Sequence, residues 1–561
     1  MKMGYSWEVA MKRLGRVYLG LSLVLVLALL VSGCGGGKPS SPSTLTSTKA
    51  STTSSTLPTT SNKTSYPPLT TTQSTTGTTG SPIPTISTMP AVLTYPFDGR
   101  NMFFGLSLIN PLMDAAKVKE MGISWLSLEP HVAWFSIEQT PGVYDWNALD
   151  GEVKLLQALG LDITMVLSPI LNAFGAERQQ VMAEIAKYPS LGYWLRQGNA
   201  GELKLYPHDE TLPIWVNFVK AAVARYDGDG KADMPGLKYA CRNWHFVEEF
   251  PIPELKDEKV YVDLLKTTSE AIKAEDPQAK VILAGLAGNY LQYFSFMDGY
   301  ITDEDAGVQD SVKHAKLWWN LNPFWKVEKQ KWEYVMDAGR GYFDIVDIHT
   351  YIPKESFMEG EIDYIQKTMQ KLGYQKPVWI IEGGGPFKNY PGKPAVNSPG
   401  DPYYGWGSEK ENAEFVIKLQ AMAAAKGVER EHWGLNEAED GYWDGPWEGM
   451  PMVDSAGYKK PSYWTFKMMR EKLENFTQAK DLSQGSLRIF NFKVGGKDVY
   501  IVWNAQGISS TADLSSVFGI RDVKVTHIVT ELDGVKNPIY PPNETKNSKS
   551  VQVGLTPIFV E

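Results

Sequence analysis

Short apolar runs alternate with longer amphipathic stretches from residue 96 to about residue 480 of the chain. The stretches Val260–Ala274 and Glu409–Ala425 have the spacing of amphipathic helices. Short buried strands that alternate with helices favour a parallel sheet covered by helices. The eight apolar runs with the length of strands are Met102–Leu108, Trp125–Leu128, Ile163–Leu167, Trp244–Val247, Val281–Ala284, Ile345–Ile348, Val378–Ile381 and His432–Leu435. Eight strands over roughly 350 residues predict an α/β fold, a (β/α)8 (TIM) barrel with long loops after the strands.

A doubly wound open sheet is the alternative architecture for the same alternation of strands and helices. Folds of that class often place a Gly-rich phosphate-binding turn after the first strand. No such turn follows Met102–Leu108. The barrel is therefore the preferred prediction for residues 96–480.

The helical period ends near Lys480, and residues 481–561 alternate between apolar and polar positions as antiparallel strands do. Turn residues such as Gly495-Gly496 and Asp533-Gly534 separate four candidate strands, which are Ser486–Lys493, Asp498–Trp503, Val523–Thr530 and Val551–Val560. The pattern predicts a small, β-sandwich-like C-terminal domain beside the barrel. We expect a structural role for it, with a separate carbohydrate-binding module as the alternative.

The first 34 residues have the pattern of a targeting segment. Basic residues up to Arg16 precede an apolar run over Val17–Val31, which is short for a membrane-spanning helix. The end of this segment, Leu30-Val31-Ser32-Gly33-Cys34, resembles the lipobox of prokaryotic lipoproteins. The resemblance implies that Cys34 carries a lipid in a membrane and that the rest of the chain lies outside the cytoplasm. An uncleaved membrane anchor is the alternative, and it predicts the same location.

Residues 35–95 consist mostly of Ser, Thr, Pro and Gly. Such a segment has too few apolar side chains to offset the entropy that ordering would remove. The composition predicts a disordered linker that holds the folded part away from the membrane.

Charge and cysteine content narrow the classes of function. The 561 residues carry a formal net charge of −9, and the acidic residues are dispersed. A nucleic-acid partner is not expected, because no basic stripe is available to displace counterions from phosphates. The chain has 2 Cys, Cys34 and Cys241, and its 7 His do not have the spacing of a zinc site. We therefore expect no internal disulfide in the folded part and no metal or organic cofactor.

Two of the predicted barrel strands end in glutamates. The fourth strand, Trp244–Val247, runs into Glu248 and Glu249, and the seventh, Val378–Ile381, runs into Glu382 and three glycines. Barrel enzymes carry their catalytic groups at this C-terminal face, where the strands end. Glycoside cleavage requires two carboxyl groups across the scissile bond, so Glu249 and Glu382 are the candidate catalytic pair.

Four segments resemble motifs of the clan-A glycoside hydrolases, the retaining barrel superfamily that includes families 5, 10, 39 and 42. They are Trp244-His-Phe-Val-Glu248-Glu249, Pro377-Val-Trp-Ile-Ile-Glu382, Trp134-Phe-Ser-Ile-Glu138-Gln-Thr-Pro-Gly142-Val-Tyr144-Asp-Trp146 and Asp344-Ile-Val-Asp-Ile-His349-Thr-Tyr351. The likeness extends from about Asn101 to Glu561. It implies a retaining β-glycosidase that cleaves a carbohydrate by double displacement, with Glu382 as nucleophile and Glu249 as acid/base.

The same resemblance implies several contacts with substrate. His349 and Tyr351 stand where relatives have groups that approach the nucleophile, and Trp433 stands where the family often has an aromatic floor for the central sugar. Trp134 in the second-loop motif and Glu437 after the eighth strand are further candidates. The loop that carries Glu437 also contains Glu439, Asp440, Trp443 and Trp447, while Trp318–Trp325 is either a packed loop or an aromatic wall for outer sugars.

The sequence departs from the family pattern at two positions. Glu248 stands where the family has an Asn that usually contacts the sugar 2-hydroxyl, and Ser127 stands where many members have an Arg that orients the nucleophile. One reading of Glu248 is a preference for a 2-amino sugar, whose ammonium group would form a charge-assisted hydrogen bond. Compensation by another loop is a second reading. The alternative functions are a catalytically inactive barrel that binds glycans at the cell surface and a transglycosylase that acts on envelope glycans.

Overall fold

The computed structural model describes residues 92–107, 111–127, 130–169, 207, 209–250, 257–302, 324–352, 355–385, 387–388, 406–435, 451–454 and 456–561. The predicted signal segment with Cys34 and the predicted linker up to residue 91 lie outside these residues. So do Trp318–Pro323 and the loop residues Glu437, Glu439, Asp440, Trp443 and Trp447. Within the described ranges, no helix combines the length and the apolar character that crossing a membrane requires.

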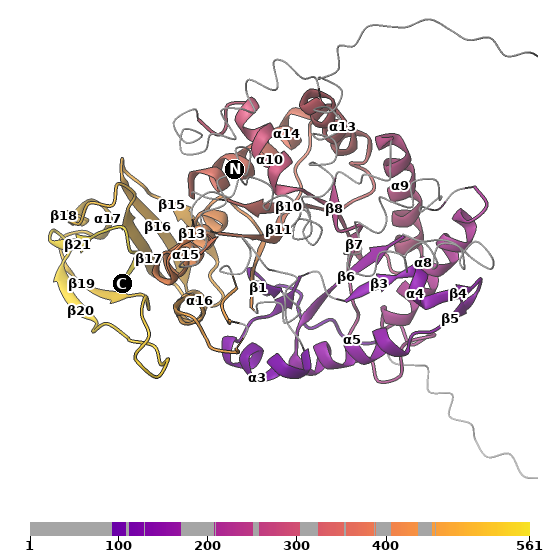
Figure 1. Cartoon of the computed structure of the whole chain (residues 1–561), viewed down its shortest axis with the longest axis horizontal. Coiled ribbons are helices and arrows are strands. Elements are labelled where there is room, and N and C mark those ends of the chain that lie inside the picture. The colour runs from indigo at the N-terminus through magenta and orange to yellow at the C-terminus, as the bar shows by residue number, and fades with distance from the viewer. Residues whose placement is uncertain are drawn as a thin grey trace, which may run out of the picture. The chain divides into compact units, whose positions relative to one another are not determined.

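Eight parallel strands close into a barrel surrounded by helices (Figure 1). β14 pairs with β1 in the register Phe104↔Glu431, so the last barrel strand in the sequence closes the ring against the first. In order around the barrel the strands are β1 (Phe104–Ser107), β2 (Trp125–Leu126), β6 (Asp162–Ser168), β7 (Asn243–Phe246), β9 (Lys280–Leu286), β10 (Ile345–Tyr351), β11 (Val378–Gly384) and β14 (Arg430–Gly434). All eight strands occur where the sequence predicts them, and the predicted (β/α)8 barrel is confirmed.

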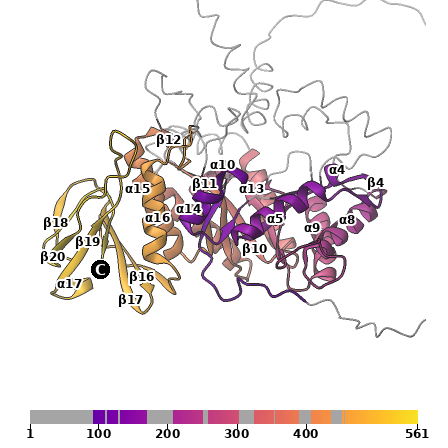
Figure 2. The ribbon, with the colours of Figure 1, turned by 90° about the horizontal axis from the view of Figure 1, so that it is seen from below.

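Helices follow the barrel strands along the chain, as the alternating pattern predicts. Their bounds are α3 (Pro111–Met121), α4 (Trp134–Ile137), α5 (Asn147–Leu159), α8 (Leu212–Tyr226), α9 (Glu258–Glu275), α10 (Gly288–Met297), α13 (Phe324–Ala338), α14 (Glu355–Lys371), α15 (Glu409–Ala425) and α16 (Pro461–Leu473). The predicted helices Val260–Ala274 and Glu409–Ala425 are confirmed as α9 and α15. Figure 2 shows α15 and α16, which pack against each other.

Short strands lie in the loops that follow the barrel strands. β3 (His131–Ala133) pairs with β6, and β8 (Glu249–Phe250) pairs with β9. β4 (Glu138–Thr140) and β5 (Val143–Tyr144) form a hairpin, and β12 (Phe387–Lys388) pairs with β13 (Trp406–Gly407). β8 is the important one for function, because it fixes the direction of the chain at Glu249.

Polar side chains interrupt the apolar barrel interior at a few positions. Parallel strands are usually apolar throughout, because both faces of the sheet are covered. Every residue of β10 is buried, yet Asp347 and His349 lie two positions apart on it. His245 on β7 and His432 on β14 are buried as well. Because buried polar groups require partners, these four residues indicate a polar network inside the barrel.

The C-terminal residues form a six-stranded antiparallel sheet in the order β15-β16-β17-β22-β19-β20, together with a two-stranded sheet β18-β21. The elements are β15 (Gln478–Asp481), β16 (Leu487–Val494), β17 (Lys497–Asn504), β18 (Ser510–Ala512), α17 (Ser515–Phe518), β19 (Asp522–His527), β20 (Glu544–Asn547), β21 (Val551–Val553) and β22 (Ile558–Val560). The predicted all-β domain is therefore confirmed. It contacts the barrel helices through Arg488, which pairs with Glu359 of α14, and through the Thr465 hydroxyl of α16, which donates to the carbonyl of Val529 at 2.7 Å.

One of the four strands predicted there was wrong. Val551–Val560 is not a single strand but two, β21 and β22, which belong to different sheets. Gly554 and Pro557 lie between them, and proline has no N–H to donate to a ladder of strand hydrogen bonds. The chain therefore leaves one sheet and joins the other within a few residues.

Candidate active site

Glu249 and Glu382 lie at the C-terminal ends of β7 and β11, as predicted. The chain leaves β7 at Val247, whose φ of +62° is in the left-handed region. This conformation is uncommon for a β-branched residue and marks a constrained turn. It is followed by β8, in which Glu249 pairs with Gly285 of β9. Glu382 is still within β11, where its register partner on β10 is His349.

His349 lies between the two glutamates. Its Nδ1 is 2.9 Å from Glu249 Oε1 and 3.3 Å from Glu382 Oε2. Because both oxygens contact the same nitrogen, they lie at most about 6 Å apart. The imidazole is fully buried, whereas the Glu249 side chain is 26% exposed. The structure thus brings together three residues that lie on three separate strands of the predicted barrel.

Asp347 lies beneath His349 in the barrel interior. Its Oδ2 is 3.1 Å from His349 Nε2 and 3.4 Å from His245 Nε2, and its Oδ1 accepts a hydrogen bond from the backbone N–H of Ile381 at 3.0 Å. The Asp347 side chain and both imidazoles are completely buried. Asp347 and His245 were not singled out from the sequence. The signal that was present is the spacing of Asp347 and His349, two polar residues on one face of a buried strand.

The hydroxyl of Tyr351 donates a hydrogen bond to Glu382 Oε1. The backbone of Tyr351 is held in turn by Gln292 of α10, whose side-chain amide donates to the Tyr351 carbonyl at 2.6 Å. Glu382 therefore receives one contact from Tyr351 and one from His349, both on β10. The resemblance implied contacts of this kind between the pair and Glu382.

Glycines allow the strands around this network to approach closely. A Cβ at Gly285 of β9 would overlap His349 Nε2 and lie 2.5 Å from Asp347 Oδ2. A Cβ at Gly383, directly after Glu382, would lie 2.6 Å from Thr350 Oγ1. Gly385 has a φ of +146°, which side chains rarely permit. The glycines after Glu382 thus allow β11 to approach β10 closely at the site.

Burial and neighbouring charges act against each other in this cluster. Burial raises the pKa of Glu382, and the charge of Glu249 raises it further, while His349 and the Tyr351 hydroxyl oppose the shift. Burial alone would lower the pKa of His349, but the carboxylates of Glu382 and Asp347 outweigh it and hold that pKa well above its ordinary value. The pKa of Asp347 is depressed despite burial, because both histidines favour its anion.

Glu248 is also close to this cluster. Burial raises its pKa, and Glu382 adds to the rise, while His131 of β3 is the main charge that opposes it. Its backbone carbonyl accepts a hydrogen bond from Gly285 N at 3.1 Å. Glu248 therefore lies at the same strand end as Glu249, where the resemblance implied a residue facing the sugar.

Two tryptophans that were candidates for substrate binding are buried in the protein. Trp134 is 1% exposed, its ring lies 5.2 Å from that of Trp215, and its indole N–H donates to Glu138. Glu138 also accepts from Gly142 N at 2.6 Å, so this pair fixes the second-loop motif. Trp433 on β14 is 1% exposed. Ser127, at the position of the expected arginine, is fully buried at the end of β2.

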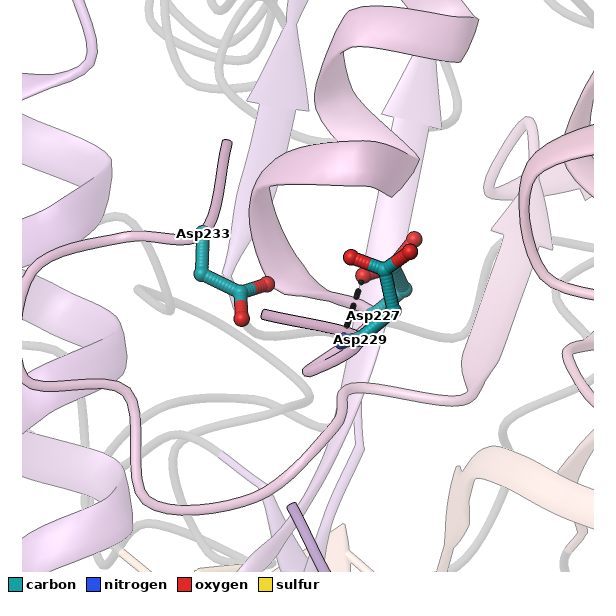
Figure 3. Close-up of side chains that lie close together, drawn as sticks. All are labelled: Asp227, Asp229 and Asp233. Atoms are coloured by element: carbon teal, nitrogen blue, oxygen red, sulfur yellow. Dashed lines mark hydrogen bonds between the residues drawn. The ribbon is translucent and has the colours of Figure 1, made fainter. Parts of the chain in front are cut away.

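Three aspartates form a separate acidic group after α8, shown in Figure 3. One carboxylate oxygen from each of Asp227, Asp229 and Asp233 lies within 4.8 Å of the others, a spacing that fits a cation. Asp233 accepts hydrogen bonds from the backbone of Gly228 and Gly230 at 3.1 and 2.8 Å. This loop leads into the N-terminal end of β7, so it lies at the opposite end of the barrel from Glu249. It therefore takes no part in chemistry at the two glutamates.

A cavity of about 790 Å³ also lies at the N-terminal ends of the strands. Charged side chains in its lining form ion pairs: Arg430 binds Asp162 at 2.8 Å, and Asp344 binds Lys273 at 2.7 Å. Catalytic groups of barrel enzymes lie at the other face. The paired charges indicate a structural role for this end of the barrel.

Comparisons with solved structures find the same architecture in carbohydrate-active enzymes. A family 39 glycoside hydrolase from Bacteroides cellulosilyticus matches with a TM-score of 0.51 and 14% identity, over 82% of this chain and 81% of that one. A glucosidase from Croceicoccus marinus matches with a TM-score of 0.47, 11% identity and coverages of 82% and 94%. A monomeric β-xylosidase from Caulobacter crescentus matches with a TM-score of 0.46, 14% identity and coverages of 84% and 97%.

No family model matches the sequence, and no curated protein matches it either. The likeness to the family 39 structure therefore shows that the fold is shared, over most of both chains. A fold of this kind supports many different reactions, so the function has to be argued from the site.

Proposed function

We propose that this protein is a retaining glycoside hydrolase that cleaves β-glycosidic bonds with Glu382 as nucleophile and Glu249 as acid/base. The observation that carries the proposal is the contact of both carboxylates with the same nitrogen of His349. Retaining enzymes hold their two carboxyl groups about 5–5.5 Å apart, and inverting enzymes need about 6.5–9.5 Å to admit a water molecule. A separation of at most about 6 Å supports the retaining mechanism.

Each glutamate has surroundings that suit its proposed role. Glu382 accepts from Tyr351 and contacts His349, and both neighbours favour the ionised form that attacks the anomeric carbon. Glu249 is partly exposed and faces the open end of the barrel. It can therefore donate a proton to the departing oxygen and later accept one from the water that releases the sugar. No cofactor is needed for either step.

Glu248 is the residue that bears on the substrate class. A 2-amino sugar remains the reading suggested by Glu248, since a carboxylate would bind an ammonium group. Burial raises the pKa of Glu248, which reduces the charge available for that contact. A neutral carboxyl would instead act as a hydrogen-bond donor and acceptor toward a 2-hydroxyl. Matched glucosides and glucosaminides in the assay below distinguish these preferences: equal rates on both would contradict the amino-sugar reading.

The test is turnover of a panel of aryl β-glycosides by the wild type and by Glu382→Gln and Glu249→Gln. We expect Glu382→Gln to abolish turnover, a loss of more than about 1,000-fold, because the amide cannot form the glycosyl-enzyme. Glu249→Gln should slow substrates with poor leaving groups by about 100-fold or more, and substrates with good leaving groups much less. The anomeric configuration of the first product, followed by proton NMR, should be retained.

Glu258→Gln, at the first residue of α9, is the matched control and should leave turnover unchanged. Unchanged rates in both active-site variants would remove the assignment. Binding of glycans without turnover would favour the inactive glycan-binding barrel. Transfer products that appear only with an added acceptor sugar would favour a transglycosylase.

We further propose that the protein acts outside the cytoplasm and is attached to a membrane through lipid on Cys34. Support comes from the basic and apolar pattern of residues 1–34 and from the Ser/Thr/Pro-rich residues that follow. Labelling of cells with a radioactive fatty acid should mark the wild type and not Cys34→Ala. Equal labelling of both would contradict the lipid attachment.

A further inference from the structure

We propose that Asp347 is a positioning residue that keeps His349 doubly protonated, so that one cationic donor is shared by Glu249 and Glu382. This inference rests on the proposed function, because it concerns how the two glutamates exchange roles. It assigns a purpose to a buried carboxylate that touches neither glutamate.

Among the described residues, the partners of the His349 ring nitrogens are all carboxylate oxygens. Nδ1 contacts Glu249 and Glu382, and Nε2 contacts Asp347 at 3.1 Å. Even with the proton on Glu249, Nδ1 faces the ionised Glu382 and Nε2 faces the ionised Asp347. An ionised carboxylate only accepts hydrogen bonds, and a ring nitrogen without its proton can only accept as well. Such a nitrogen would repel the oxygen opposite to it. Both ring nitrogens are therefore satisfied only when both carry protons.

Asp347 is held as an anion by its other contacts. Its Oδ1 accepts from the backbone N–H of Ile381, and its Oδ2 faces Nε2 of His245 as well as Nε2 of His349. His245 Nε2 also lies 3.2 Å from the carbonyl of Leu283, and its Nδ1 has no hydrogen-bond partner among the described residues. This arrangement suits a neutral His245 that donates through Nε2. The positive partner of buried Asp347 is then His349.

Other titratable groups around the pair leave this assignment intact. His432 of β14 is the remaining histidine of the interior, but burial lowers its pKa to about 3, so it is neutral at the pH of interest. The groups that face His349 and Asp347 are His245, Glu248 and Glu249 from the β7 side, Glu382 from β11, His432 from β14 and Tyr351 on β10 itself. The net charge of these groups is negative, and a negative surrounding charge favours the protonated imidazole of His349.

Space for the pair is provided by the neighbouring strand. β9 has Gly285 opposite the contact between His349 and Asp347, and a Cβ there would overlap both side chains. Any other residue at this position would have to displace the imidazole or the Asp347 carboxylate. The close approach of backbone to the pair supports a geometry that is held in place rather than one free to adjust.

A shared donor matches the movement of charge during double displacement. Before attack Glu382 is ionised and Glu249 carries the proton. Attack by Glu382 forms the ester bond to the sugar and breaks the glycosidic bond, while the Glu249 proton goes to the departing oxygen. The negative charge has then moved from Glu382 to Glu249, and attack by water returns it. His349 Nδ1 is within 3.3 Å of an oxygen of each carboxylate, so one N–H can stabilise the charge at both positions.

The first experiment measures the protonation of His349 directly. Wild-type protein is labelled with 15N in its histidine rings, and the His349 resonances are identified by their loss in His349→Gln. We expect both ring nitrogens to be protonated at about pH 7.5, well above the ordinary histidine pKa. In Asp347→Asn, which keeps the shape and the acceptor for Ile381 N–H but removes the charge, one ring nitrogen should be deprotonated at the same pH.

The second experiment follows activity against pH. Asp347→Asn should lower kcat by roughly 10- to 100-fold, because the charge-assisted hydrogen bonds from His349 are lost. The alkaline limb of the pH profile should move to lower pH by about one unit or more, because His349 loses its second proton more easily without the charge of Asp347. KM should change less than kcat. Asp344→Asn is the matched control: Asp344 precedes β10 at its other end, binds Lys273 and should leave both readouts unchanged.

The outcomes separate this inference from the proposed function. A singly protonated His349 in the wild type overturns the inference, whether or not Asp347→Asn folds. An unchanged spectrum and pH profile in a folded Asp347→Asn overturn it as well. If the wild type shows a doubly protonated His349 that depends on Asp347 but hydrolyses no glycoside, the proposed function fails and the assignment of Asp347 stands.

Discussion

The two ends of the barrel both contain buried charge, but they treat it differently. At the N-terminal ends of the strands, Asp162 accepts from the Tyr95 hydroxyl at 2.7 Å, from Asn243 at 2.9 Å and from Arg430 at 2.8 Å. Arg430 also lies 4.1 Å from the centre of the Trp379 ring. One anion and one cation thus neutralise each other and are surrounded by donors and aromatic rings.

At the C-terminal ends, three carboxylates surround a single imidazole. Glu249, Glu382 and Asp347 all contact His349, and among the described residues no lysine or arginine forms an ion pair with them. The repulsion between the carboxylates is not balanced by a second cation here, and the excess of negative charge raises the pKa of both Glu382 and His349. This difference indicates that a balanced ion pair stabilises the barrel, whereas a cluster with an excess of one charge shifts pKa values and so favours proton transfer.

The largest effect on stability should come from breaking the pair of Asp162 and Arg430 at the N-terminal ends of the strands. Asp162→Ala leaves Arg430 buried without its anion, so we expect the free energy of unfolding to fall by about 3–5 kcal/mol, measured by urea denaturation. The protein that remains folded should keep its kcat. Glu249→Gln, in the unbalanced cluster, should change stability by less than about 1 kcal/mol. A loss of turnover in folded Asp162→Ala would show that the two ends are coupled and would break the comparison.

Gly285→Ala tests the close packing of β9 against His349 and Asp347. The added Cβ must displace His349 or Asp347, so we expect kcat to fall by about 100-fold, with a loss of stability of about 1–3 kcal/mol. Gly341→Ala is the control, because a Cβ there meets no atom within 4 Å and its backbone is not in the left-handed region. Wild-type turnover in Gly285→Ala would mean that the position of the imidazole does not matter.

Tyr351→Phe removes the hydroxyl that binds Glu382 and keeps the ring. Since a hydrogen bond to a charged group contributes about 1.5–3 kcal/mol, kcat should fall by at least about tenfold while the melting temperature stays the same. Tyr374→Phe removes a hydroxyl bound to the carbonyl of Met336 and should leave kcat unchanged. Equal effects of the two substitutions on kcat would contradict the orienting role of Tyr351.

The smallest effect is expected at the acidic loop after α8. Burial, aided by Asp229 and Asp233, raises the pKa of Asp227 to about 7. A carboxyl with a raised pKa contributes stability below its unfolded pKa, and this contribution is lost as the pH rises through about 7. Asp227→Asn should therefore raise the melting temperature slightly at pH 8 and leave it unchanged near pH 4. A lower melting temperature at pH 8 would contradict this sign.

Most of the fold could be predicted because the barrel strands are short, apolar and separated by helical stretches. The ends of Trp244–Val247 and Val378–Ile381 also indicated Glu249 and Glu382, since charge directly after a buried strand is unusual. β15, β18 and β20 were not predicted, and β15 and β20 are edge strands of the C-terminal sheet. Their polar residues, such as those of Glu544–Asn547, are typical of sheet edges and resemble loops in a sequence.

The network beneath the glutamates required the structure. The spacing of Asp347 and His349 places both side chains on one face of the strand, but the sequence does not reveal which residues of other strands meet Asp347 there. His245 and Gly285 lie on two further strands, and only the register of the closed sheet brings them to Asp347. The surroundings of Trp134 also required the structure: the motif suggested a contact with sugar, and the ring lies against that of Trp215.

The pairing of Phe104 with Glu431 has a consequence for how the chain folds during synthesis. β1 and β11 each keep one free edge until β14 has been made, because β14 is the partner of both. Almost the whole barrel sequence lies between β1 and β14, and closing so long a loop is slow. Free strand edges readily pair with other chains during that time. The strand that carries Glu382 is thus completed late, and refolding yields should fall as protein concentration rises.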